Sequence, residues 1–259
     1  MMQMEYNTYE DLINQETQII KKTIDESPEI GWFKQFYEDI QKIIFQIPYK
    51  RRNNELLENP AIYYLILTST LKIIYISNSI LRLISRGYYG QGMNLLRAIQ
   101  DEYHHLLFFN YHPPNQIKQW NEGKIKSKHI QRYMSTSKHI PKKWKGIVKH
   151  GIKLYEILSS FVHPSRYGWR GVVLVDKVTG DNILKILPIY ENNSFNTIFI
   201  GLMSYLSNTT LLLLDIYERE LKDSGIYNNI MQKLKQCESE YMLPTLKNMT
   251  LDTHLNIIG

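Results

Sequence analysis

Apolar residues recur at helical spacing along most of the chain and predict a mainly α protein. The pattern favours a single bundle of about eight helices, because no internal repeat or long linker divides the sequence. The long predicted helices cover residues 8–26, 28–46, 60–86, 93–110, 141–162, 194–221 and 224–241, with shorter helical stretches over 115–121 and 127–137. Residues 47–60 are predicted to be a polar connector, because they contain Pro48 and a run of charged and amide side chains.

The hydrophobic period changes once, between residues 171 and 187. Two short β-type runs, 171–176 and 182–187, flank the turn signal Thr179-Gly180-Asp181 and predict one appended β-hairpin over about 171–187. The predicted organisation is an N-terminal helical pair over residues 1–59 packed on the core, a helical bundle with its hairpin over 60–241, and a C-terminal tail over 242–259.

Residues 192–214 carry no charge and are long enough to span a bilayer. They also contain many asparagine, serine and threonine residues, so we interpret them as a buried bundle helix and expect no membrane contact. A membrane-associated protein is the weaker alternative. The chain has one cysteine and a polar N-terminus without an apolar stretch, which predicts a cytoplasmic location.

The charge is concentrated in one segment. Residues 118–153 contain eleven lysine or arginine residues and one acidic residue, whereas the rest of the chain is mildly acidic. Such a segment attracts polyanions through phosphate contacts, so RNA is the expected partner. Trp120, Tyr133 and Trp144 are available to stack on bases, the alternative being a solvated helical face with ordinary buried aromatics. The candidate RNA-binding residues are Lys124, Lys126, Lys128, Arg132, Lys142, Lys143, Lys149 and Arg166.

Two polar stripes are candidates for chemistry. Arg97, Asp101 and His104 share one helical face, and Glu156 and His163 have the same spacing on a later helix that ends before a proline. A histidine beside an arginine can act as general base on a ribose 2′-hydroxyl while the arginine stabilises the developing charge. The five residues therefore form a candidate catalytic site for metal-independent RNA cleavage. The alternative is structural: Asp101 pairs with Arg97, and His163 completes its helix.

No cofactor or metal is expected. Glu102 and His105 have the spacing of a di-iron ligand pair, but no second pair exists in the chain. Phosphate-binding glycine loops and a serine nucleophile elbow are also missing from the sequence.

Three motifs carry a family resemblance. Residues 96–102 (Leu-Arg-Ala-Ile-Gln-Asp-Glu), 120–124 (Trp-Asn-Glu-Gly-Lys) and 158–164 (Leu-Ser-Ser-Phe-Val-His-Pro) resemble motifs of a poorly characterised group of prokaryotic helical proteins. That group is similar to HEPN domains, and the resemblance covers about residues 60–221. The HEPN signature is an arginine, four to six residues, then a histidine. Arg97 and His104 fit it, although Ala98 is apolar where the signature has a polar residue.

The resemblance implies a helical bundle that forms a homodimer and cleaves RNA without a metal. It also implies a role in prokaryotic antiviral defence or in a toxin–antitoxin system. A second implication stays open: a non-catalytic HEPN-like subunit that binds a partner protein of the same defence system, or senses a signal for it.

Overall fold

The computed structural model has the predicted mainly helical bundle. It describes residues 9–27, 29–53, 60–126, 130, 134, 136–148, 173–175, 182–184, 188, 190 and 192–244. The elements are α1 (Tyr9–Glu26), α2 (Ile30–Asn53), α3 (Pro60–Ile84), α4 (Tyr89–Tyr111), α5 (Pro114–Asn121), β1 (Val173–Val175), β2 (Asn182–Leu184), α8 (Asn192–Ile216), α9 (Glu218–Lys222), α10 (Ile226–Cys237) and the π-helix η2 (Glu238–Met242). Residues 142–148 are also helical.

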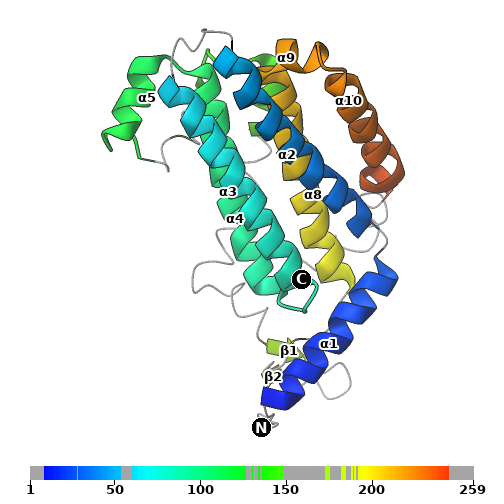
Figure 1. Ribbon diagram of the computed structural model, residues 1–259. Helices are drawn as coiled ribbons and strands as arrows, with labels where there is room; N and C mark the ends of the chain where they lie inside the picture. The colour runs from blue at the N-terminus through cyan, green and yellow to red at the C-terminus, as the bar shows by residue number, and fades with distance from the viewer. Residues whose placement is uncertain are drawn as a thin grey trace.

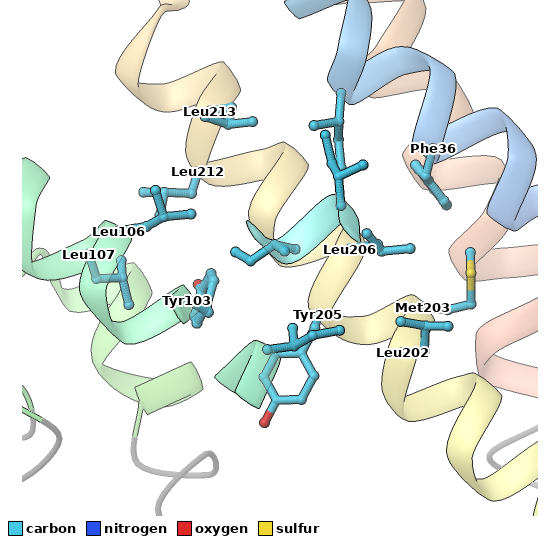
Figure 2. Packing of buried hydrophobic residues seen from close by; sticks show 14 of the residues in the cluster. Phe36, Tyr103, Leu106, Leu107, Leu202, Met203, Tyr205, Leu206, Leu212 and Leu213 are labelled. Atoms are coloured by element: carbon cyan, nitrogen blue, oxygen red, sulfur yellow. The ribbon is translucent and has the colours of Figure 1, made fainter. Parts of the chain in front are cut away.

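The hydrophobic core lies where α2, α4 and α8 meet (Figure 1). Phe36 of α2, Leu106 of α4 and Leu206 of α8 are fully buried, and Figure 2 shows side chains from all three helices converging. α3 packs along α4 and completes this part of the bundle. α2 thus belongs to the same core as the helices after residue 60, because its apolar stripe packs against α8.

Two glycines allow the helices around α4 to approach closely. A Cβ added at Gly92 would lie 2.5 Å from Ile84 Cγ2 of α3, and one added at Gly201 of α8 would lie 2.8 Å from Leu96 Cδ2 of α4. The sequence predicts that Gly90 and Gly92 loosen the start of the helix. The structure instead includes both in α4, because the close contact at Gly92 compensates for the poor helix propensity of glycine.

The polar connector predicted over 47–60 is wrong in its first half. α2 continues through Pro48 to Asn53. Its last turns contain Lys50, Arg51 and Arg52, residue types with good helix propensity. The helix predicted over 194–221 is also divided, since Tyr217 leaves helical geometry (φ −116°, ψ 25°) between α8 and α9.

α8 accounts for the uncharged stretch. By length and composition alone, Ile62–Ile84 and Ser194–Ile216 are both apolar enough to cross a membrane. In the most apolar 18-residue window of each helix, 67% of the residues are buried in α8 but only 39% in α3. The lack of charge in α8 is therefore explained by its place inside the bundle, whereas part of the apolar surface of α3 stays exposed.

β1 and β2 pair in antiparallel register, with Val173 opposite Leu184 and Val175 opposite Asn182. The other residues of the predicted 171–187 hairpin lie outside the described residues. The appended hairpin as a unit therefore stays a prediction.

A buried carboxylate joins α2 to α10. Asp39 is 1% exposed, and both of its oxygens lie 3.1 Å from Nζ of Lys233. Lys42 Nζ is 3.5 Å away, and Gln35 donates a hydrogen bond of 3.3 Å. A charge this deeply buried is tolerated only because it is paired on several sides.

Replacing Asp39 by alanine is expected to lower the free energy of unfolding by about 3–5 kcal/mol, since Lys233 would lose its buried partner. Urea unfolding followed by circular dichroism measures the change. Glu218→Ala is the matched control, because it breaks the exposed ion pair with Lys222 (2.6 Å), and solvent screening makes the expected loss much smaller. Equal losses in both variants would contradict the assignment.

Candidate functional site

The polar stripe of α4 lies largely inside the protein. Arg97 and Asp101 are half-buried, on successive turns as the spacing predicted. Burial raises the pKa of Asp101, while the charges of Arg97 and His105 lower it in part. The structural alternative predicts that Asp101 pairs with Arg97, and the charge of Arg97 does lower the pKa of Asp101.

His104, the candidate general base, is only 3% exposed. Its ring packs beside Tyr103, with the ring centroids 6.3 Å apart, and its Nδ1 has no hydrogen-bond partner in the described part of the chain. Burial, and secondarily His105, lower the pKa of His104 to about 4, so the ring is neutral at pH 7. A general base must reach the proton that it removes, and the burial of His104 weighs against this role.

The other half of the predicted catalytic site, Glu156 and His163, lies outside the described residues. The meeting of the two polar stripes therefore stays a prediction. The same holds for four of the candidate RNA-binding residues, namely Lys128, Arg132, Lys149 and Arg166.

Glu102 lies between His105 of its own helix and Lys72 of α3. His105 Nδ1 lies 3.6 Å from Glu102 Oε2, and Lys72 of α3 donates a 3.1 Å hydrogen bond to the other carboxylate oxygen. Burial raises the pKa of Glu102, but the neighbouring His105 and the hydrogen bond from Lys72 outweigh it and lower the pKa overall. Within the described ranges, no group of three His, Cys, Asp or Glu side chains is arranged to hold a metal ion.

Lysines gather around the C-terminal end of α4. α5 and residues 136–148 both pack there, and the C-terminal ends of α2 and α8 reach the same end of the bundle (Figure 1). Among the described residues, five lysines of this region have no acidic partner. We call these five lysines the basic end: Lys118, Lys126, Lys138, Lys142 and Lys145.

Of the predicted RNA-binding lysines that the structure describes, Lys124 and Lys143 are paired with acids. Lys124 Nζ lies 2.6 Å from Glu122, and Lys143 forms an ion pair with Asp215. A lysine that is held by a carboxylate contributes less to a field that attracts phosphate. The sequence could not separate paired from unpaired lysines, because Asp215 is 72 residues away from Lys143.

The tryptophans of the basic segment serve the fold. Trp144 is 4% exposed and donates a 2.7 Å hydrogen bond to the Tyr111 hydroxyl. Trp120 packs edge-on against Phe109 and His105, at centroid distances of 4.9 and 5.5 Å. The burial of Trp144 excludes base stacking on its ring, whereas Trp120 is half-buried and its stacking role stays a prediction.

Asp215 is the centre of a polar cluster at the end of α8. Tyr111 donates to its Oδ2 at 2.5 Å, Trp144 donates to the same oxygen at 3.4 Å, and Lys143 pairs with Oδ1. Burial raises the pKa of Asp215, but the hydrogen bonds from Lys143 and Tyr111 outweigh this and lower it overall. The cluster fixes residues 142–148 against α4 and α8.

His112 provides a second contact to this segment. It is 5% exposed, its Nε2 lies 3.0 Å from Ser137 Oγ, and its ring stacks on Phe108 at 4.6 Å. Burial, followed by the nearby His139, lowers the pKa of His112 to about 4. The sequence analysis missed His112, Asp215 and Tyr111, since none of them belongs to a motif and their partners are distant in sequence.

Comparisons with known proteins add no relative. No family model, no curated protein and no solved structure matches the chain.

The free energy of unfolding is expected to fall as the pH drops from 7 toward 4. An unfolded histidine titrates near 6.5, whereas His104 and His112 titrate near 4 in the folded chain. Between these values the unfolded state binds more protons, so stability decreases by up to about 1.4 kcal/mol per pH unit for each histidine. Urea unfolding at pH 7.5 and 5.0 measures the effect. The double variant His104→Gln/His112→Gln should reduce the difference, and an unchanged difference would contradict this origin.

Proposed function

We propose that the protein binds RNA through the basic end and acts as a non-cleaving subunit. The observation that carries the proposal is the basic end itself: five unpaired lysines around one end of a rigid bundle. Most of them, including Lys118, Lys138 and Lys142, are exposed. Lysines without internal partners are free to replace the counterions of a phosphate backbone, which drives binding.

The proposed binding reads the backbone of the RNA rather than its bases. Trp144 is buried and Trp120 packs on Phe109, which weighs against a stacking platform. Ammonium groups contact phosphates without reading sequence. We therefore expect strong salt dependence and weak sequence preference.

Non-cleaving function is favoured because the candidate base is buried. His104 lies in the core, and a substrate hydroxyl would have to enter the helix packing to reach it. This favours the second implication of the HEPN resemblance, a binding subunit within a prokaryotic defence or toxin–antitoxin complex. Such a role includes a partner protein of the same system and a cytoplasmic location, where RNA is available.

Replacing lysines of the basic end is expected to weaken RNA binding. Lys118→Gln, Lys126→Gln and Lys142→Gln should each reduce the slope of log K against log salt by about 0.7 for a single-stranded RNA. Fluorescence anisotropy with a labelled 20-nucleotide RNA at several salt concentrations measures the slope. Lys21→Gln is the control, since Lys21 is exposed on α1, outside the basic end.

The same RNA tests the competing ribonuclease. The wild-type protein is expected to bind it in EDTA and leave it intact. Cleavage that is lost in both His104→Ala and His163→Ala would overturn the non-cleaving role and restore the catalytic assignment. Failure of the wild type to bind would overturn the proposed function.

Self-association is a second candidate property, favoured by the outer face of α3. Tyr64 and Tyr75 are 62% and 66% exposed, and their spacing places them on the same side of the helix. The one lysine between them, Lys72, is neutralised by Glu102. A weakly charged aromatic face of this kind suits the homodimer that the family resemblance implies.

The double variant Tyr64→Lys/Tyr75→Lys is expected to convert a dimer to a monomer, because four like charges would face each other across a twofold interface. Size-exclusion chromatography with light scattering gives the mass. Ile24→Lys is the control, since Ile24 is equally exposed (61%) but lies on α1. A monomeric wild type, or a variant that stays dimeric, would contradict this interface.

A further inference from the structure

The Asp215 cluster lies between the basic end and the core. Among the described residues of this region, Lys143 is the one lysine that pairs with an acid from another helix. Lys143 is 57% exposed along its side chain, whereas Asp215 is 25% exposed. The ammonium group is thus accessible to solvent while the carboxylate is partly covered. Tyr111 and Trp144 both donate to Oδ2 of that carboxylate, whereas Lys143 pairs with Oδ1.

We propose that Asp215 limits the RNA affinity of the basic end by competing with phosphate for Lys143. The inference deepens the proposed function and rests on it. The Asp215 carboxylate neutralises the Lys143 ammonium and repels a phosphate placed beside it, so Lys143 contributes less to phosphate binding while Asp215 holds it. Lys142, its neighbour, has no such internal competitor among the described residues.

Conformational entropy favours Asp215 over an RNA phosphate in the competition for Lys143. Its carboxylate is fixed by two hydrogen bonds, so binding Lys143 orders little more than the lysine side chain. An RNA phosphate must displace this partner and then order itself. Lys143 is therefore neutralised in the folded chain. It becomes available to a phosphate when Asp215 loses its negative charge.

Asp215→Asn tests the proposal, because the amide oxygen can still accept from Tyr111 and Trp144 while the negative charge is lost. One additional phosphate contact should raise the salt slope for single-stranded RNA by about 0.7 and tighten binding roughly three- to five-fold at 0.1 M salt. Anisotropy titrations of the full chain measure both. Asp223→Asn is the charge-matched control, since Asp223 is an exposed acid just after α9 that does not contact Lys143. It should change affinity less than two-fold.

Lys143→Gln separates release of this lysine from a general loss of negative charge. In the wild-type background it should weaken binding less than Lys142→Gln does. In the Asp215→Asn background it should remove the gain, whereas Lys142→Gln should have the same effect in both backgrounds. Such non-additivity shows that Asp215 and Lys143 act through each other.

Three results decide the matter. Wild-type binding together with an unchanged salt slope in Asp215→Asn overturns the inference and leaves the proposed function standing. Equal gains in Asp215→Asn and Asp223→Asn also overturn it, since any lost acid would then have the same effect. No wild-type binding overturns both. If Asp215→Asn does not fold by circular dichroism, the comparison of Lys143→Gln with Lys142→Gln decides, and equal losses overturn the inference.

Discussion

Close packing of α4 between α3 and α8 is the constraint on which the rest of the structure depends. At Gly92 and Gly201 a Cβ would lie 2.5 Å from Ile84 Cγ2 and 2.8 Å from Leu96 Cδ2, so a larger residue would force these side chains to shift. The neighbouring helices bury about half of α4, including the run from Tyr103 to Phe109 that contains His104. Protein interiors hold few voids larger than a water molecule, which weighs against a substrate reaching these buried side chains.

This burial decides what the polar residues of α4 can do. Along its middle, Arg97 and Asp101 are coupled to each other and Glu102 is held by Lys72, so charge is compensated inside the protein. His104 is kept neutral by its surroundings. The C-terminal end of the helix, near Tyr111, lies beside the lysines of the basic end. In the described part of the chain, polar residues along the middle of α4 thus interact with other residues of the fold.

The end of the bundle where α2, α4 and α8 terminate combines two electrostatic effects. The C-terminal ends of helices carry partial negative charge, which favours nearby lysines and makes their accumulation tolerable. Fixed carboxylates such as Asp215 then determine how many of those lysines remain available. RNA affinity in the proposed role is therefore a balance between lysines that are free and lysines that the fold has neutralised.

The sequence by itself determined the mainly helical class, most helix positions and the location of the basic segment, because apolar spacing and local charge are properties of neighbouring residues. It also predicted that Arg97 and Asp101 share a face. Only the tertiary structure decided that His104 is buried, that Trp144 serves the fold, and that Lys143 is paired while Lys142 is not. Burial and pairing depend on residues far apart in the chain, such as Asp215, and no local pattern contains that information.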